Sequence, residues 1–288
     1  MSARSTLVWS VRRELWEHRW VFVVPAIVAA VVLVGFVVGA VGSPDRVRAF
    51  VVPDAAAHPP QVVRPYSLAA AMILFASFVA GLYYCLDALY GERRDRSVLF
   101  WKSMPVSDAM TVLAKACVPL VVIPAIGAIV ALATQLAMLP LNAAFLAARG
   151  VGPGALWDGL PLASMTIVMV YGLAVHALWF APIYGWLFVV SAWVRRAAFL
   201  WAVLPFFAAF VVEKVAFDST VVARLVGYRF TGAMAEAFKV DAGRQAITGL
   251  AQLDPLRFLS APGLWAGLAF AAVCFATAVR LRRHRDPI

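Results

Sequence analysis

Charged residues are scarce in this chain of 288 residues. Asp, Glu, Lys and Arg together make up only 14% of it, whereas 64% of the residues are hydrophobic, and the mean hydropathy is +0.86. A soluble domain carries about 25% charged residues. The composition therefore excludes an ordinary soluble globular domain and indicates that lipid surrounds most of the chain.

Cysteine is also rare, and the three cysteines are isolated. Cys85, Cys117 and Cys274 lie inside or at the edge of apolar segments, and no Cys-x-x-Cys pair occurs. This pattern supports neither a disulfide framework nor a zinc site. We expect these residues to pack as small hydrophobic side chains.

Motifs for catalysis are missing too. The chain contains no G-x-x-x-x-G-K-[ST] phosphate loop, no H-E-x-x-H and no G-x-S-x-G. Of the four histidines, only His176 lies in a long apolar run, where it either lines a polar pathway or hydrogen-bonds to a neighbouring helix. We therefore predict a protein that is not an enzyme by itself, with no catalytic residue, no metal site and no cofactor of its own.

Long apolar runs are what the chain has in abundance. A helix needs about 20 mostly apolar residues to cross the hydrocarbon core. The sequence predicts six such spans, at about residues 20–43, 65–86, 116–139, 164–190, 197–212 and 260–279. The fourth lies in an uncharged stretch longer than one span needs, and we expect it to be tilted or broken near Pro182. Residues 1–288 are thus expected to form a single all-α, polytopic transmembrane domain.

The Lys and Arg residues predict the orientation of these spans. Six spans would place both termini, the 2–3 loop and the 4–5 turn on one side, and these segments hold 15 of the 25 Lys and Arg residues. Because cytoplasmic loops are enriched in Lys and Arg, both termini are expected in the cytoplasm. The net charge of +10 is then explained by the enrichment of Lys and Arg on the cytoplasmic side. It favours contact with membrane lipid rather than with nucleic acid.

Residues 5–19 predict an amphipathic helix ahead of the first span. Its apolar stripe is Leu7, Val8, Val11 and Leu15, with Trp16 nearby. Its polar side holds Arg12, Arg13, Glu14, Glu17 and Arg19. Such a helix lies in the headgroup plane. It is either a simple anchor or a connecting helix that also touches a cytoplasmic partner.

The loop between the second and third spans joins a mixed-sign charge cluster to an aromatic stripe. The residues singled out are Asp87, Glu92, Arg93, Arg94, Asp95, Arg96, Phe100, Trp101 and Lys102. If residues 92–102 are helical, Glu92 faces Arg96 at i, i+4, and Ser107 is expected to cap the third span. Since Arg and aromatic residues are enriched at binding hot spots, the loop predicts a docking surface for a soluble protein. The alternative is a structural turn with interfacial aromatics.

Residues 213–259 form the longest loop on the opposite side. Two amphipathic stretches, residues 219–225 and 231–250, are broken at Gly227 and Gly243. They predict short helices on the outer leaflet. These helices either cap an exit path or only lie on the membrane.

Two segments resemble a known family. Residues 90–108, Y-G-E-R-R-D-R-S-V-L-F-W-K-S-M-P-V-S-D, are similar to the 2–3 coupling loop of bacterial ABC-2 type transporter permeases. Residues 262–265 (P-G-L-W) and 280–288 (R-L-R-R-H-R-D-P-I) resemble their last span and tail. The six-span layout and the N-terminal interfacial helix fit the same family along nearly the whole chain.

The resemblance implies the membrane subunit of a type V-like ABC exporter in the bacterial inner membrane. A separate ABC ATPase subunit would hold ATP and Mg, and a second permease copy would complete a homodimer. The 2–3 loop would be the cytoplasmic coupling helix, and the N-terminal helix would help to transmit its motion. The substrate would be an amphipathic, peptide or lipid-like molecule. The alternative is an energy-independent channel or scaffold.

Overall fold

The computed structural model describes residues 3–42, 60–97, 106–150, 160–239 and 249–284. Within these residues the chain is helical and contains no strand, apart from one isolated bridge between Phe238 and Leu253. Six helical segments of the described chain are long and apolar enough to cross a membrane. The prediction of an all-α polytopic protein is therefore confirmed.

The helices follow one another with short breaks. In chain order they are α1 (Ala3–Glu17), α2 (Trp20–Gly42), α4 (Pro60–Ala88), α5 (Tyr90–Arg94), α7 (Asp108–Cys117), the π-helix η1 (Val118–Val122), α8 (Ile123–Ala147), α10 (Leu162–Trp179), α11 (Ala181–Trp193), α12 (Ala198–Phe217), α13 (Val221–Ala237), the 3₁₀ turn η2 (Leu250–Gln252), α14 (Pro255–Ser260) and α15 (Pro262–His284).

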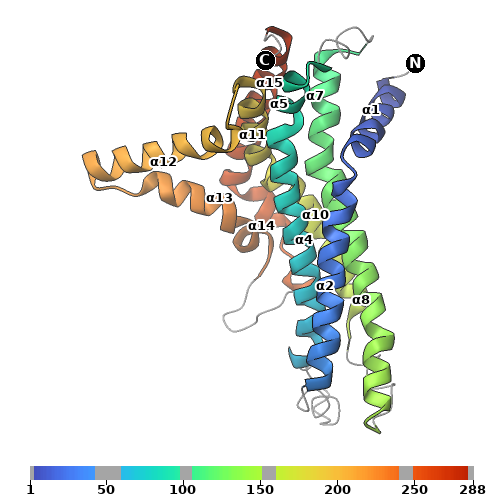
Figure 1. The fold of residues 1–288 in the computed structure, drawn as a ribbon. Coiled ribbons are helices and arrows are strands. Elements are labelled where there is room, and N and C mark those ends of the chain that lie inside the picture. The colour runs from blue at the N-terminus through green and yellow to red at the C-terminus, as the bar shows by residue number, and fades with distance from the viewer. Residues whose placement is uncertain (1–2, 43–59, 98–105, 151–159, 240–248, 285–288) are drawn as a thin grey trace.

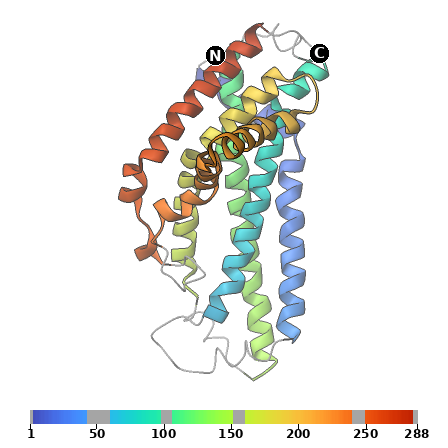
Figure 2. The same cartoon turned by 90° about the vertical axis from the view of Figure 1, so that its left-hand side faces the viewer.

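Most long helices form an upright bundle (Figure 1). Helices α2, α4 and α8 pack side by side, and α11 packs along α15. The N- and C-terminal ends lie at the same end of the bundle, together with α1, α5 and α7 (Figures 1 and 2). We call this the termini end. A core of buried residues from α2, α4, α7, α11 and α15 lies next to it, with Tyr84, Tyr184 and Phe188 fully enclosed.

Two spans are longer than their uncharged runs. Helix α4 begins at Pro60 rather than near residue 65, and the third span extends from Asp108 to Ala147 rather than over residues 116–139. The third span therefore includes Lys115, which the sequence places in the loop. Carboxylates from other helices pair with the Lys115 ammonium group. The helix can therefore include this charged residue and need not begin at the first uncharged one.

The third span contains a π-helical turn at two prolines. The N–H of Ile123 bonds to the carbonyl of Val118, an i→i+5 bond. The next i→i+5 bond would run from the N–H of residue 124 to the carbonyl of Pro119. Residue 124 is a proline and has no N–H, so the Pro119 carbonyl receives no such bond. His176 of α10 hydrogen-bonds to the Pro119 backbone and lies 3.0 Å from the Tyr184 hydroxyl through Nε2. His176 thus bonds to neighbouring helices, one of its two predicted roles, and satisfies a carbonyl freed by the prolines.

The fourth uncharged stretch is two helices, not one. Helix α10 ends at Trp179, and α11 begins at Ala181 with Pro182 in its first turn. Pro182 cannot donate a backbone hydrogen bond, so a continuous helix would lose a bond there. Helix α11 has 13 residues, about 20 Å of helix, and reaches the termini end.

Helices α12 and α13 project sideways from the bundle as a hairpin that we call the arm (Figure 1; in Figure 2 the arm points toward the viewer). The fifth span was expected over residues 197–212. Helix α12 instead runs to Phe217, points away from the bundle and leaves its apolar side chains exposed. Helix α13 continues through Gly227, so the predicted break there is wrong. The break predicted at Gly243 lies outside the described residues.

Helix α13 returns to the bundle through close contacts at glycines. Arg229 lies over the Trp179 ring, with the guanidinium carbon 4.7 Å from the ring centre. It donates to the carbonyl oxygens of Trp179 (3.1 Å) and Gly263 (2.8 Å). A Cβ atom at Gly267 would approach the Arg229 Nη2 atom to 2.4 Å, and one at Gly232 would approach the Trp179 ring to 2.8 Å. These glycines let the base of the arm lie against α10 and α15.

Candidate functional site: a buried ionic cluster at the termini end

Charged side chains from four parts of the chain meet at the termini end. They come from α1, from α5, from both ends of α7 and from the end of α15. The ion pairs of this cluster join Arg13, Glu14, Glu92, Asp108, Lys115 and Arg282. Three carboxylates therefore face three cations, so the cluster is balanced in charge.

Glu14 lies at one side of the cluster and is only 1% exposed. Its Oε2 atom accepts hydrogen bonds from Lys115 Nζ (2.9 Å) and from the Tyr84 hydroxyl (2.8 Å). Its Oε1 atom accepts one from Arg13 Nη2 (2.6 Å). Helix α1 presents Glu14 to the bundle because it lies between Val11 and Leu15, which pack against the core.

The Glu14 carboxyl is held ionised. Burial by itself raises the pKa, but the charges and hydrogen bonds of Lys115 and Arg13 outweigh it and bring the pKa down to about 2. Buried charges are stable only when they are paired and hydrogen-bonded. A shift of α1 relative to α7 that separates Glu14 from Lys115 would therefore be costly.

Glu92 lies at the centre of the cluster. Its carboxylate is 3.2 Å from Lys115 Nζ, 3.3 Å from an Arg282 Nη2 atom and 3.7 Å from an Arg13 Nη2 atom. Arg282 also pairs with Asp108. One carboxylate on α5 thus links α1, α7 and α15. A displacement of α5 would disturb the partners of three other helices.

Arg93 fastens α5 to a fourth neighbour, the end of α11. Its Nη1 atom donates to the carbonyl oxygens of Ala192 (2.6 Å) and Val194 (3.1 Å), which lack intrahelical partners at a helix end. In return, the buried Ser191 hydroxyl accepts from the backbone N–H groups of Leu89 (3.0 Å) and Tyr90 (2.9 Å) at the start of α5. The two contacts form a reciprocal clasp between α5 and α11.

The structure divides the residues predicted for the 2–3 loop. Glu92 and Arg93 are buried and point inward, whereas the next three residues, 94–96, are exposed. Asp87 is half-buried at the end of α4. Phe100, Trp101 and Lys102 lie outside the described residues.

The expected helix over residues 92–102 is wrong in its described part. Helix α5 ends at Arg94, and Arg96 has a left-handed backbone with φ of 56°. Glu92 therefore pairs with other helices instead of with Arg96 at i, i+4. Ser107 does cap the third span, since its hydroxyl accepts from the N–H of Met110 at 3.2 Å.

The N-terminal helix is present, but its faces differ from those expected. Glu14 was placed on the polar side and is instead buried, and Val8 was placed on the apolar side and is instead exposed. Arg13 is half-buried beside Glu14, with its Nε atom 3.5 Å from Glu17. Arg12, Trp16 and Glu17 are exposed.

The sequence prediction missed four members of this site. Lys115, Tyr84 and Arg282 are partners of Glu14 or Glu92, and Asp108 pairs with Arg282. One signal was available: Glu14 shares a helix face with Val11 and Leu15, and an ionisable residue inside an apolar stripe needs a buried partner. Which partner it finds depends on residues about 70 and 100 positions away.

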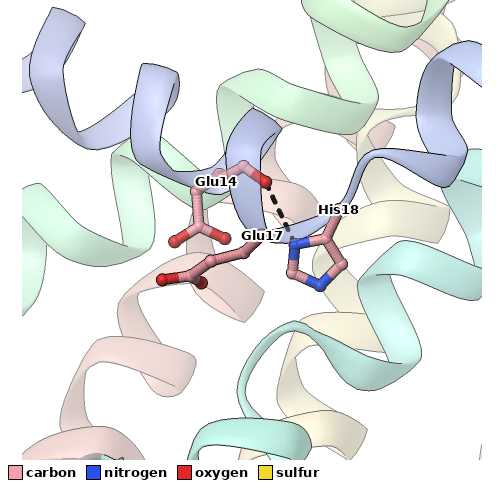
Figure 3. Close-up of side chains that lie close together, drawn as sticks. All are labelled: Glu14, Glu17 and His18. Carbon is pink, nitrogen blue, oxygen red and sulfur yellow. Dashed lines mark hydrogen bonds between the residues drawn. The ribbon is translucent and has the colours of Figure 1, made fainter.

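Glu14, Glu17 and His18 lie close enough together to suggest a metal site (Figure 3). The contacts of Glu14 do not fit one, because both of its carboxylate oxygens already bind side chains and two of these are cations. His18 uses its Nδ1 atom for the Glu14 carbonyl oxygen (3.1 Å), the dashed line in Figure 3. We therefore interpret Glu14 as a member of the ionic cluster rather than as a metal ligand.

No family model matches this chain, and no curated protein matches it. The fold class is therefore stated from the structure alone: an all-α chain with the helices of a multi-pass membrane protein.

Proposed function

We propose that this chain is the membrane-spanning permease subunit of an ATP-driven exporter, with the ATPase on a separate chain. One observation carries the proposal. The exposed segment of residues 94–96 is joined directly to Glu92 and Arg93, which bind four other helical elements through buried polar contacts. A soluble subunit that docks on residues 94–96 would therefore move α1, α7, α11 and α15 together.

The buried charges suit this role because they resist partial displacement. Removing one partner of a buried pair costs about 3–5 kcal/mol. When α5 moves slightly, the helices paired with it are therefore expected to move with it, since breaking the pairs is costly. Exposed pairs would not serve, since they contribute about 0–1 kcal/mol. The resemblance of residues 90–108 to the coupling loop of ABC-2 permeases supports the same role.

The remaining parts of the proposal follow from the resemblance and from the charge distribution. The termini end would face the cytoplasm of a bacterial inner membrane, because it carries most of the Lys and Arg residues. Two copies would pair around a path for an amphipathic, peptide or lipid-like substrate. ATP and Mg would be bound by the ATPase subunit. A channel or scaffold without an energy source is the competing function, and it requires no docking at residues 94–96.

The first experiment is purification of the tagged full-length chain from its native host in mild detergent, followed by mass spectrometry. We expect a stoichiometric partner that contains a Walker A phosphate loop. The variant carrying Arg94→Glu and Arg96→Glu should lose this partner while still folding, because both side chains are exposed. A single Arg224→Glu variant, on the exposed side of α13, is the control for a charge reversal elsewhere and should retain it.

The opposite result would favour the channel or scaffold. If crosslinking before purification also recovers no ATPase, the exporter proposal is wrong. If an ATPase is recovered equally with the wild type and with the double variant, the exporter proposal stands but docking at residues 94–96 is wrong.

A further inference from the structure

The outward face of α1 combines arginine and tryptophan. Arg4, Val8, Trp9, Arg12 and Trp16 fall on one side of a helix with 3.6 residues per turn, and all five are exposed. Trp9 is 55% exposed and Trp16 60% exposed. The described part of this face contains no carboxylate, because Glu14 and Glu17 lie on other sides of the helix.

Arg12 is the centre of this face. Its guanidinium carbon lies 5.3 Å from the centre of the Trp9 ring and 4.9 Å from that of Trp16. The two rings hold the planar group in place through cation–π contact. Among the described residues no carboxylate pairs with Arg12, whereas its neighbour Arg13 pairs with Glu14. No carboxylate of the described residues therefore occupies the N–H edge of Arg12, which leaves this edge available to a ligand outside the chain.

The position of α1 indicates what that ligand is. Helix α2 starts at Trp20 and exposes Phe22, Val23 and Ile27, as expected of a surface in contact with hydrocarbon. Its 23 residues match the thickness of the hydrocarbon core, about 30 Å, so Trp20 lies near one boundary. Helix α1 lies beyond this boundary, packed beside α7 (Figure 1). The outward face is thus at the level of lipid headgroups.

We propose that the Arg12 face of α1 is a binding site for the phosphate group of an anionic phospholipid. The guanidinium donates two parallel N–H bonds to phosphate oxygens, the geometry that favours Arg over Lys. Trp9 and Trp16 lie at the depth where indole rings are enriched in membrane proteins. Arg4 and the exposed Arg19 add positive charge, which favours a net-negative headgroup over a zwitterionic one.

This site does not depend on the proposed transport function. It assigns the outward face of α1 to lipid and the inward face, with Glu14, to the ionic cluster. An anionic lipid on one face would then hold the helix whose other face is tied to Lys115.

The test is native mass spectrometry of the full-length protein in detergent, titrated with phosphatidylglycerol or phosphatidylcholine. We expect the wild type to retain phosphatidylglycerol preferentially. Arg12→Gln should weaken phosphatidylglycerol binding about fivefold, the effect expected for one basic residue near the surface. Arg12→Lys should restore only part of the loss, because it keeps the charge but not the planar fork. Arg224→Gln on α13 is the matched control and should bind like the wild type.

Three results would overturn the site. Equal retention of the two lipids would show that this surface does not select an anionic headgroup. Equal loss in Arg12→Gln and Arg224→Gln would show only a general attraction to positive charge. If Arg12→Gln leaves phosphatidylglycerol binding unchanged but loses a co-purifying protein, the face is a protein interface.

Discussion

The ionic cluster at the termini end and the arm differ in which side chains they bury and which they expose. The cluster pairs six charged side chains within one chain, and four of them, Glu14, Glu92, Lys115 and Arg282, are buried. The arm does the reverse, since only 6% of the α12 span is buried and side chains such as Phe207, Val215 and Phe217 are exposed. The ion pairs of the cluster are thus made within a single copy, whereas the apolar surface of the arm requires lipid or another chain around it.

A helix of the cluster is fixed by buried ion pairs, whereas the outer part of the arm makes few contacts with the rest of the chain. At the termini end, loss of one charge leaves others buried without a partner, and the cost is high. On the arm, an exposed charge or apolar side chain can change with little effect on the folded chain by itself.

The largest effect is expected for Lys115→Met. It leaves Glu14 and Glu92 buried beside each other with fewer cations, and the free energy of unfolding should fall by about 3–5 kcal/mol. The control is Lys214→Met on α12, where an exposed pair with Asp218 is lost and the change should stay within about 1 kcal/mol. Thermal unfolding in detergent measures both. Equal shifts would mean that the cluster does not stabilise the termini end.

The second prediction concerns pH and Glu14. Its pKa in the folded chain, about 2, lies below the reference value of 4.5, so its ionised form stabilises the fold. This contribution is complete above about pH 4.5 and is lost as the pH falls toward 2. The wild type should therefore lose stability over that range more steeply than Glu14→Gln. Parallel pH profiles of the unfolding midpoint would contradict the assignment.

The third prediction uses two adjacent arginines. Arg93→Met removes the hydrogen bonds to the carbonyl oxygens of Ala192 and Val194, and about 1.5–3 kcal/mol of stability should be lost. Arg94→Met changes an exposed side chain and should leave the unfolding midpoint nearly unchanged. An inverted order would mean that the clasp between α5 and α11 contributes little.

The smallest effect tests the base of the arm. A Cβ atom at Gly232 would meet the Trp179 ring at 2.8 Å, whereas one at Gly227 of the same helix would meet nothing within 4 Å. Gly232→Ala should therefore destabilise the contact of α13 with α10 by about 1–3 kcal/mol. Gly227→Ala should be neutral or slightly stabilising, because alanine is the better helix former. Limited proteolysis of the arm, together with the unfolding midpoint, distinguishes the two.

Local patterns were enough for several features. The apolar runs predicted the all-α fold, because about 20 apolar residues can be solvated by lipid only as a helix. Ser107 was recognised as a helix cap, and Pro182 as the place where a long stretch breaks, since both effects act within one turn of the chain. The role of His176 was left open between two alternatives, and the contact with Tyr184 decided it.

Local patterns could not predict which residues of the 2–3 loop are buried and which are exposed. Glu92, Arg93 and Arg94 are neighbours of similar polarity, yet two face inward and one faces out. The face follows from where α11 and α15 pack, and their contributing residues are about 100 to 190 positions distant in the chain. The direction of α12 was equally hidden, because an apolar helix has the same composition whether it crosses the bundle or leaves it.

The sequence by itself determined that this chain is helical, that it has the apolar length for six crossings, that Ser107 caps the third span, and that the fourth stretch breaks near Pro182. These properties depend on hydropathy, proline and capping, which act over a few residues. Only the tertiary structure decided which charges are buried, which helices α5 holds together, and that the Arg12 face of α1 points outward. Those outcomes depend on pairing between distant segments, because a charge can enter an apolar interior only where another helix brings its partner.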